Sequence, residues 1–412
     1  MALGLILLIG DYDGKRICVI GPNGDNGKNL LGGYVNQNPR FIATPLTGIA
    51  DLLPSAEVIH LQGCLNDTGC FSLNSTEIAD AVLDKCDLAV LAIGLTSYAH
   101  SKDEPGDACG CIFGDAVEGE CCDRQDVKLP GKQLDLIQAV VASQQKKGTR
   151  VVVFSVNAGM LDLSWAQDND GVGAILVGGY LGMSTGTALA STLFGANNPA
   201  GRLPITYYAD IGEIGPLGND YSVFPTASSF GRTYRFFTGK TPLYPFGFGL
   251  SFSEFQYGAM AMSPGGSSAQ PCTEVQISVD VTNTGGADGD EVVQLYISIE
   301  NASVPTALRQ LVSFQRIRIP AGKTHRALFS IGPAEHAVMR KGDYADVVEP
   351  GRRTVWVGAS SDPLRSPGVS SSYAVEGDVT RVAECDGAGK QPGPRGVGGV
   401  RDSARWVPDG AN

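Results

Sequence analysis

A cluster of carboxylates between residues 117 and 131 is the part of the sequence best suited to acid–base chemistry. The segment reads VEGECCDRQDVKLPG, in which Glu118, Glu120 and Asp123 stand beside Arg124. Burial or a neighbouring carboxylate raises the pKa of a Glu, whereas an adjacent guanidinium keeps an Asp ionised, so adjacent acids can take different roles. One acid of this cluster could donate a proton while its neighbours position sugar hydroxyls. The alternative is a solvated acidic loop, because runs of charge usually lie at the surface.

Other patterns that suggest chemistry do not meet the requirements of their motifs. The segment from Gly21 to Asn29 lies where a phosphate-binding loop would. However, five residues instead of four separate Gly21 from Gly27, and the residue after Lys28 is Asn29 in place of Ser or Thr. We therefore predict an ordinary strand-to-helix turn. The four His residues have no metal-binding spacing, and disulfides or free thiols are favoured over zinc for Cys109, Cys111, Cys121 and Cys122. No metal and no cofactor are predicted.

Composition excludes several classes of partner. Asp and Glu outnumber Lys and Arg by 43 to 31, for a net charge of −12. Such a chain offers no basic face to nucleic acid or to anionic lipid, and a neutral ligand such as a sugar suits it better. No apolar stretch reaches the roughly 18 residues of a transmembrane helix. With 412 residues and 43% hydrophobic content, the chain is long enough for two or three domains.

Cysteines and glycosylation sequons indicate an oxidising, secretory setting for the parent protein. The chain has ten Cys residues, and Cys64 and Cys70 are close enough in sequence for a short disulfide. The sequons place possible glycosylation at Asn66, Asn74 and Asn301. The opening MALGLILLIGDYDGK has neither a basic n-region nor a cleavage site, so no signal peptide is predicted in this chain.

Residues 1–210 are predicted to form an α/β domain, a parallel-sheet α/β/α sandwich. Amphipathic stretches at 75–86, 131–147 and 184–194 alternate with short apolar runs, as βαβ units require. Ligands usually bind at the carboxyl ends of parallel strands, which include the loop after Gly94. The predicted strands are RICVIG, EVIHLQG, LAVLAIG, RVVVFSV, GAILVGGY and LPITYY.

The remaining residues are predicted to form three further segments. Residues 211–268 are rich in aromatic residues and Gly, and we expect an ordered connector. Residues 269–361 alternate apolar and polar residues at hairpin spacing, with turns at 283–286 and 320–322, which predicts an all-β fibronectin type III-like sandwich. Residues 362–412 have no apolar period and are predicted to be a disordered tail.

Several of these segments together resemble glycoside hydrolase family 3, especially its β-xylosidase-like branch. The resemblance covers residues 4–360 and rests on GPNGDN, YVNQNPRFIATPLTGI, VEGECCDRQDVKLPGKQLDLI, VVVFSVNAGMLDLSWA and GRTYRFFTG, in that order. The segment VTNTGGADGDEVVQLYI is similar to the third, fibronectin-like domain of the family. The resemblance implies exo-acting hydrolysis of β-xylosides or β-glucosides in xylan or cell-wall breakdown, with retention through a covalent glycosyl-enzyme intermediate.

The resemblance also implies roles for individual residues. Glu118 is the acid/base candidate, Glu120 is the fallback and Glu104 is a third possibility, while Asp123 and Arg124 orient the site. The nucleophile is an Asp of a barrel domain, and no nucleophile is expected in this chain, because it begins where the second domain begins. We therefore predict a truncated enzyme, inactive alone, whose partners are a β-linked oligosaccharide and the missing barrel. The alternative is a non-catalytic carbohydrate-binding or interaction module. The preference among xylose, glucose and arabinose is not predicted.

Overall fold

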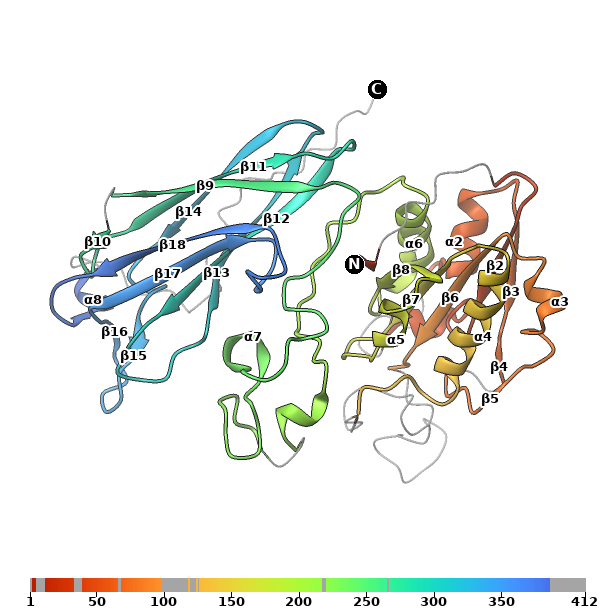
Figure 1. The fold of residues 1–412 in the computed structure, drawn as a ribbon, viewed down its shortest axis with the longest axis horizontal. Helices are drawn as coiled ribbons and strands as arrows, with labels where there is room; N and C mark the ends of the chain where they lie inside the picture. The colour runs from red at the N-terminus through yellow and green to blue at the C-terminus, as the bar shows by residue number, and fades with distance from the viewer. Residues whose placement is uncertain are drawn as a thin grey trace. The chain divides into compact units, whose positions relative to one another are not determined.

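The computed structural model describes residues 2–4, 12–32, 39–65, 68–97, 118, 124, 126–216, 220–264 and 267–385. The chain forms two compact units (Figure 1). The first unit comprises Met1–Glu254, Asn283–Asp290 and Arg318–Lys323, and the second comprises Phe255–Thr282, Glu291–Ile317 and Thr324–Asn412.

A six-stranded sheet forms the centre of the first unit. Its strand order is β1-β8-β7-β6-β2-β3, and every pair is parallel except β1 with β8. The strands are β1 (Ala2–Gly4), β2 (Arg16–Ile20), β3 (Glu57–Leu61), β6 (Leu88–Gly94), β7 (Val151–Val156) and β8 (Val172–Val177). All residues of β6 and β7 are buried, which explains why these strands are continuous apolar runs in the sequence. The predicted α/β class is confirmed.

Helices cover both faces of this sheet. Alternate residues of each strand enter two separate cores, one packed against α3 and α4 and the other against α1, α2 and α6. These helices are α1 (Gly27–Leu31), α2 (Pro45–Leu52), α3 (Asp80–Leu83), α4 (Gln133–Lys146) and α6 (Thr185–Leu193). The domain also contains a short helix, α5 (Ser164–Gln167), and a 3-10 turn, η2 (Gly182–Ser184). It includes a two-stranded sheet of β4 (Cys64–Leu65) and β5 (Ser72–Leu73) as well.

Two glycines bring α2 and α6 unusually close together. A Cβ atom on Gly48 would lie 2.1 Å from the carbonyl carbon of Gly186, and one on Gly186 would lie 1.8 Å from the carbonyl oxygen of Thr44. Thr44 is also the N-cap of α2, because its side chain accepts a hydrogen bond from the amide of Thr47. Side chains at either glycine would therefore push the helices apart and break the start of α2.

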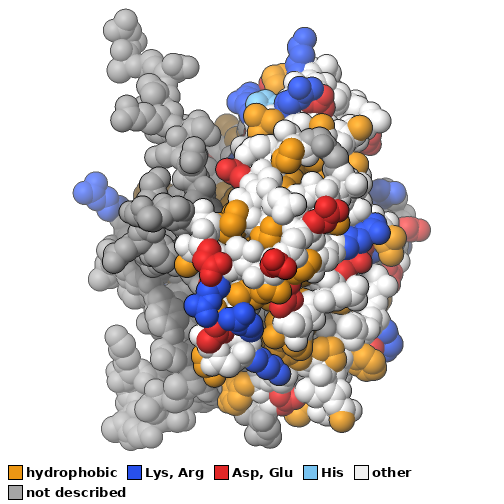
Figure 2. Space-filling view, turned by 90° about the vertical axis from the view of Figure 1, so that its left-hand side faces the viewer, with side chains coloured by type: hydrophobic (Ala, Val, Ile, Leu, Met, Phe, Trp, Pro, Cys, Tyr) orange, Lys and Arg blue, Asp and Glu red, His pale blue; other side chains and the backbone are white. Residues whose placement is uncertain are grey.

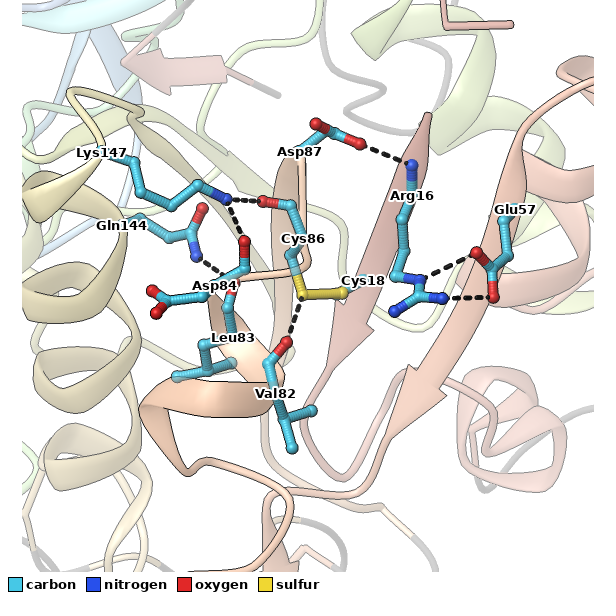
Figure 3. Close-up of a disulfide and its surroundings, with 10 residues drawn as sticks. All are labelled: Arg16, Cys18, Glu57, Val82, Leu83, Asp84, Cys86, Asp87, Gln144 and Lys147. Carbon is cyan, nitrogen blue, oxygen red and sulfur yellow. Dashed lines mark hydrogen bonds and ion pairs between the residues drawn. A yellow bond between two sulfur atoms is a disulfide. The ribbon is translucent and has the colours of Figure 1, made fainter. Parts of the chain in front are cut away.

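A buried disulfide ties the first parallel strand to the chain that enters the central one. Cys18 of β2 and Cys86, two residues before β6, are both fully buried and are joined across 68 residues of sequence (Figure 3). Closing a loop of that length removes about 4 kcal/mol of unfolded-state entropy in the simplest model. On the same face, the Lys147 ammonium donates to the carbonyls of Asp84 and Cys86.

The prediction of a strand at residues 203–208, LPITYY, is wrong. This segment does not join the sheet; instead its backbone pairs with the connector, from Leu203 to Phe248 at 2.8 Å and from Tyr207 to Tyr244 at 2.9 Å. Pro204 has no amide hydrogen to donate to a strand ladder. The predicted connector contains η3 (Ile211–Ile214) and α7 (Thr233–Phe236). Its predicted end at residue 268 is too late, because Phe255–Ser263 forms β9 of the second unit.

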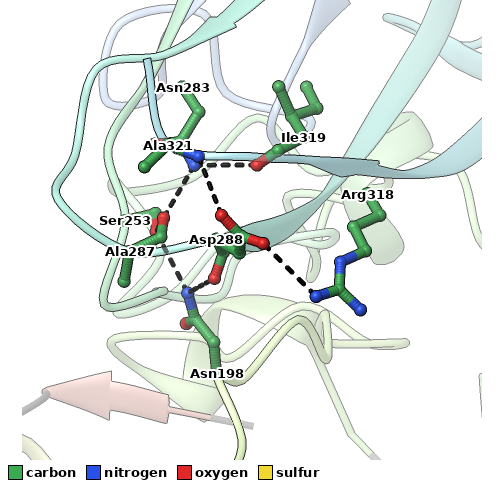
Figure 4. Close-up of polar contacts among 8 residues, drawn as sticks. All are labelled: Asn198, Ser253, Asn283, Ala287, Asp288, Arg318, Ile319 and Ala321. Atoms are coloured by element: carbon green, nitrogen blue, oxygen red, sulfur yellow. Dashed lines mark hydrogen bonds and ion pairs between the residues drawn. The ribbon is translucent and has the colours of Figure 1, made fainter. Parts of the chain in front are cut away.

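Two turns, 283–290 and 318–323, belong to the first unit and are held by side-chain amides (Figure 4). Asn198 donates to the carbonyl of Asp288 at 2.9 Å, and its own oxygen accepts from the amide of Phe252. The buried Asn283 donates to the carbonyls of Ala287 and Ile319, each at 2.8 Å. Both amides therefore replace backbone partners that these irregular turns lack.

The second unit consists mainly of β-sheets. A five-stranded sheet has the order β10-β18-β17-β12-β13, and a three-stranded sheet has the order β14-β11-β9. Their inward residues alternate with polar ones, as in β11 and β14, and the predicted fibronectin type III-like architecture is confirmed. The strands are β9 (Phe255–Ser263), β10 (Ser268–Ala269), β11 (Val275–Asn283), β12 (Gly289–Ile299), β13 (Gln310–Ile319), β14 (Thr324–Ile331), β17 (Gly351–Gly358) and β18 (Gly368–Val375).

The prediction of a disordered tail from residue 362 is wrong for residues 362–385. There the chain forms β18, which pairs antiparallel with β17 along its whole length, and then β19 (Thr380–Arg381) and α8 (Val382–Cys385). A disulfide joins Cys385 to Cys272. Backbone pairing and this cross-link order a segment whose Ser-rich composition lacks an apolar period. A small sheet of β15 (Val338–Met339), β16 (Asp346–Val348) and β19 lies in the same unit.

The surface carries charges of both signs. Acidic, basic and hydrophobic side chains are interspersed over the face drawn in Figure 2. In the second unit, for example, Asp343 pairs with Arg340 at 2.5 Å and with Arg381 at 2.8 Å. Exposed pairs of this kind contribute only about 0–1 kcal/mol each. None of the helices in the described ranges combines the length and apolar character that a membrane span requires.

A histidine is fully buried in the second unit beside a buried arginine. His336 and Arg353 both have no exposed surface, and the His336 Nδ1 lies 3.2 Å from the hydroxyl of Tyr373. Burial, and secondarily the Arg353 charge, lower the pKa of His336 to about 4. The imidazole is therefore neutral in the folded protein at neutral pH.

We predict that Gly186→Val lowers the free energy of unfolding of the first unit by about 1–3 kcal/mol or more, because the added side chain overpacks the contact between α2 and α6. Gly286→Ala is the matched control: Gly286 has no atom near its Cβ position, and we expect a change within about 0.5 kcal/mol. Urea unfolding monitored by circular dichroism measures both values. Equal stabilities for the two variants would contradict the close helix contact.

We also predict that the second unit loses stability in mild acid. An unfolded His binds a proton below about pH 6.5, whereas folded His336 resists protonation down to about pH 4. The titration of His336 therefore leaves the free energy of unfolding unchanged above about pH 6.5 and lowers it by up to about 3 kcal/mol as the pH drops to 4. His336→Gln should flatten this dependence in unfolding curves recorded between pH 7.5 and 4.5. The exposed His325→Gln should not, and identical slopes for the two variants would refute the prediction.

Candidate functional site

Glu118 lies at the carboxyl edge of the parallel sheet of the first unit. Its amide donates to the carbonyl of Thr96 at 3.0 Å, and Thr96 comes two residues after the end of β6. This edge is where ligands bind in parallel α/β sheets. The backbone contact therefore brings the residue to the place that the predicted topology favours for a site.

The Glu118 carboxylate accepts hydrogen bonds from the chain that follows the next two strands. After β7, the amide of Ala158 donates to Oε1 at 2.5 Å and that of Gly159 donates to Oε2 at 2.7 Å. After β8, the Tyr180 hydroxyl donates to Oε1 at 2.7 Å. Hydrogen bonds to a charged acceptor are about twice as strong as neutral ones, so three donors hold this side chain firmly in one orientation. We refer to these three donors as the Glu118 cradle.

Two tyrosines near the carboxylate stay protonated. Burial, followed by the neighbouring Glu118 charge, raises the pKa of Tyr180 far above its ordinary value. Burial likewise raises the pKa of Tyr207 to about 12. The Tyr207 hydroxyl accepts from the buried amide of Asn157 at 3.2 Å, and Asn157 also donates to the carbonyl of Gly159 at 2.6 Å. Asn157 therefore braces the turn that carries two of the three cradle donors.

The end of β6 is shaped by a glycine and a buried glutamine. Gly94 has a φ of +123°, and a Cβ atom there would lie 2.2 Å from the carbonyl oxygen of Val156. Gln133, at the start of α4, accepts from the Gly94 amide at 2.8 Å and donates to the Gly94 carbonyl at 2.9 Å. Its amide nitrogen also bonds the carbonyl of Thr68. These contacts turn the chain after β6 toward Glu118.

A pocket of about 610 Å³ opens beside Glu118 in the first unit. One part of its lining comes from the domain itself, including Gly159 and Met160 after β7 and Asp126 near the predicted motif. Another part comes from the connector, including Thr233, Tyr234, Arg235 and Phe246. Its size and mixture of apolar walls with a few polar groups are typical of small-molecule sites.

Arg124 is the second residue of the predicted cluster that the structure describes at this pocket. Its guanidinium donates to the carbonyl of Lys128 at 2.6 Å and lies 3.7 Å from the Asp126 carboxylate. The structure therefore brings Glu118 and Arg124 to one pocket. Glu120, Asp123 and Glu104, which the sequence analysis also named, lie outside the described residues.

The segment from Gly21 to Asn29 makes protein contacts of its own. The buried Asn23 donates to the carbonyl of Ile93 at 3.0 Å, and the buried Asn29 donates to the Asn23 side chain and to the carbonyl of Leu95. A five-residue helix, α1, follows, as expected of an ordinary strand-to-helix turn. Within the described ranges, no group of three His, Cys, Asp or Glu could hold a metal ion.

The remaining residues named from the sequence have varied positions. Cys64 and Cys70 form a disulfide. Asn301 is exposed, and Asn74 is partly buried. Asn66 and the four other cysteines named from the sequence, Cys109, Cys111, Cys121 and Cys122, lie outside the described residues.

Sequence reasoning missed the residues that hold Glu118. Ala158 and Gly159 are 40 and 41 residues away in the sequence, and Tyr180 is 62 residues away. The two amides come from backbone, which carries no residue-type signal. The one available clue was topology: both segments directly follow predicted parallel strands, whose carboxyl ends share an edge.

Comparison with protein families identifies both parts of the chain. Residues 8–252 match the model of the glycosyl hydrolase family 3 C-terminal domain, and residues 291–361 match that of the fibronectin type III-like domain. The chain is 34% identical over 354 residues to a β-xylosidase of Formosa agariphila, a match that covers 84% of this chain and 44% of that protein. It is 30% identical to the exo-1,4-β-xylosidase xlnD of Emericella nidulans, over 76% of this chain and 38% of that protein.

Solved structures lead to the same family. A family 3 exo-β-xylosidase, XlnD, in complex with a xylobiose aziridine activity-based probe, matches with a TM-score of 0.73 and 26% identity, over 91% of this chain and 46% of that one. A β-glucosidase from Erythrobacter marinus matches with a TM-score of 0.67 and 28% identity, over 88% and 46% of the two chains.

These matches span less than half the length of the curated relatives. They nevertheless cover both units of this chain, in the order that the sequence resemblance indicated. The chain belongs to glycoside hydrolase family 3, of which it contains the C-terminal α/β domain and the fibronectin type III-like domain.

Proposed function

We propose that this chain supplies the acid/base residue of an exo-acting, retaining β-xylosidase or β-glucosidase, and that Glu118 is this residue. The observation that carries the proposal is the position of the Glu118 carboxylate, which is fixed by three donors at the carboxyl edge of the sheet and lines a pocket. The β-xylosidases and β-glucosidases among its relatives support the substrate class.

In the proposed reaction Glu118 acts twice. It first gives its proton to the glycosidic oxygen as the bond to the anomeric carbon breaks, while a nucleophilic carboxylate forms a covalent bond to that carbon. It then removes a proton from a water molecule that attacks the same carbon and releases the sugar with retained configuration. The cradle donors complement the ionised carboxylate, which is the form that the second step requires.

The nucleophile in this proposal is an Asp of a barrel domain, as the family resemblance implies. A retaining mechanism needs the two carboxyl groups about 5–5.5 Å apart on opposite sides of the scissile bond. The 412 residues taken by themselves should then bind substrate without cleaving it. Arg124, anchored to Lys128 and Asp126, would hold the segment that carries Glu118, and Asp123 would assist it.

We also propose that the parent protein folds in the secretory pathway or outside the cell. Three disulfides support this setting: Cys18–Cys86, Cys64–Cys70 and Cys272–Cys385. Disulfides of this kind persist in oxidising compartments and are rare in the cytosol of mesophiles. Glycosylation of the exposed Asn301 would accompany such a route in a eukaryotic host.

The role of Glu118 is tested by Glu118→Gln in a polypeptide that joins this chain to the barrel domain of a family 3 β-xylosidase. We expect kcat/KM on xylobiose to fall by roughly 10²–10⁴, because its leaving group needs a proton. Nitrophenyl β-xyloside should be affected less, since nitrophenolate leaves without one, and azide should partly restore turnover of the intermediate. The exposed Glu376→Gln is the control. Equal effects of the two substitutions would rule out Glu118 as the acid/base.

The need for a separate nucleophile is tested on the 412-residue chain alone. We expect no hydrolysis of nitrophenyl β-xyloside or β-glucoside above background, for either the wild type or Glu118→Gln. A xylobiose aziridine probe should likewise leave the mass of the chain unchanged. Turnover by the wild type, or a covalent adduct in mass spectrometry, would show that a carboxylate of this chain acts as the nucleophile.

A further inference from the structure

The turn that follows β7 is closed by its own first side chain. Asn157 is buried, and its Nδ2 donates to the carbonyl of Gly159, two residues later, at 2.6 Å. A carbonyl oxygen only accepts, so this contact fixes which end of the Asn157 amide faces it. The Asn157 oxygen accepts in turn from the hydroxyl of Ser155 in β7. The carbonyl side of Gly159 is therefore held by a buried side chain whose orientation is defined.

The turn has room for the Glu118 carboxylate only because its third residue is a glycine. The Gly159 amide donates to Oε2 of Glu118 at 2.7 Å, and a Cβ atom on Gly159 would lie 2.9 Å from the same oxygen. The carboxylate, at the end of a flexible side chain, would be the group that moves away. The amide of Ala158 points to the same carboxylate, and successive amides of this kind form a concave site for an anion. The missing side chain at Gly159 therefore decides where the carboxylate lies.

The segment that leads into the connector reaches the same turn. The buried Tyr207 accepts, at its hydroxyl, a hydrogen bond from Nδ2 of Asn157 at 3.2 Å. The next residue, Tyr208, donates its amide to the sulfur of Met160 at 3.1 Å. The Tyr207 ring packs edge to face against Tyr244 of the connector, with centroids 5.9 Å apart, and the two backbones are hydrogen-bonded to each other. The turn after β7 is thus joined to the connector at two points.

We infer that Gly159 and Tyr207 are positioning residues for Glu118, acting through the turn after β7. This inference rests on the proposed function of Glu118 and deepens it. Gly159 leaves the space that the carboxylate occupies, and Tyr207 steadies the Asn157 side chain that closes the turn. Residues 203–208 do not extend the sheet, and their pairing with the connector instead brings Tyr207 to Asn157. The connector therefore helps to set where the proton is delivered.

Gly159→Ala, in the polypeptide that joins this chain to a family 3 barrel, tests the first positioning residue. We expect kcat/KM on xylobiose to fall about tenfold, because a displaced acid delivers its proton poorly. On nitrophenyl β-xyloside it should stay within about twofold, since nitrophenolate leaves without a proton. Gly332→Ala in the second unit is the matched control and should change neither value. The Gly332 amide also donates to a carboxylate, that of Glu335, at 2.9 Å, and its Cβ would lie 3.0 Å from the same oxygen.

Tyr207→Phe tests the second positioning residue. It removes one hydroxyl, and we expect the same selective loss on xylobiose, about threefold, because Asn157 keeps its bond to Gly159. Tyr257→Phe is the control, since it removes a hydroxyl that donates to the buried Glu291 at 2.9 Å in the second unit. Thermal unfolding of each variant checks that the first unit is intact. Gly159→Ala removes no side chain and keeps the test decisive if Tyr207→Phe is destabilised.

The outcomes separate this inference from the acid/base role of Glu118. Once Glu118→Gln has removed the acid, adding Gly159→Ala should cause no further loss on xylobiose. A further loss in that double variant, or equal losses on both substrates in Gly159→Ala, would overturn the inference. A selective loss in Glu118→Gln without one in Gly159→Ala or Tyr207→Phe would overturn the positioning roles alone. No selective loss in Glu118→Gln would overturn the acid/base assignment and, with it, this inference.

Discussion

The hydrogen bonding at the carboxyl edge of the parallel sheet is the constraint on which the site depends. Parallel strands end at a common edge, where backbone amides no longer have ladder partners and can turn toward a ligand or a side chain. In this chain the amides of Ala158 and Gly159 meet the carboxylate of Glu118, and the Tyr180 hydroxyl completes the set. One acidic side chain thus joins the ends of β6, β7 and β8.

The geometry of that edge depends in turn on the buried interior of the first unit. The backbone of Gly94 lies so close to that of Val156 that no side chain fits at this position. The side chain of Gln133 makes hydrogen bonds to both the amide and the carbonyl of Gly94. The disulfide between Cys18 and Cys86 ties β2 to the chain entering β6, the strand that leads to Glu118. The position of Glu118 therefore depends on the ends of the strands, and the ends of the strands depend on the packing of the core.

The sequence was sufficient to predict the parts of the fold that a local pattern encodes. Five apolar runs are parallel strands, and alternation identified the sandwich strands β11 to β14 and β17, whereas β9 lies in the segment that was predicted to be the connector. Residues 203–208 look equally strand-like, but Pro204 and their pairing with the connector exclude them from the sheet. Residues 368–375 include three consecutive Ser residues and show no regular apolar period, but they are ordered by pairing with β17. For the site, the acidic motif indicated Glu118 and Arg124, whereas its donors at Ala158, Gly159 and Tyr180 depend on tertiary contacts that no local pattern contains.

The hydrogen bonds from the amides of Ala158 and Gly159 to the Glu118 carboxylate are tested most directly by NMR, through the resonances of these two amide protons in deuterated protein. An amide that donates to a carboxylate resonates downfield, because the charge deshields the proton. We predict that both resonances move upfield in Glu118→Ala, and that Tyr180→Phe shifts them less while leaving them hydrogen-bonded. Unchanged Ala158 and Gly159 resonances in Glu118→Ala would show that the carboxylate is not held at the sheet edge, and would contradict the proposed site.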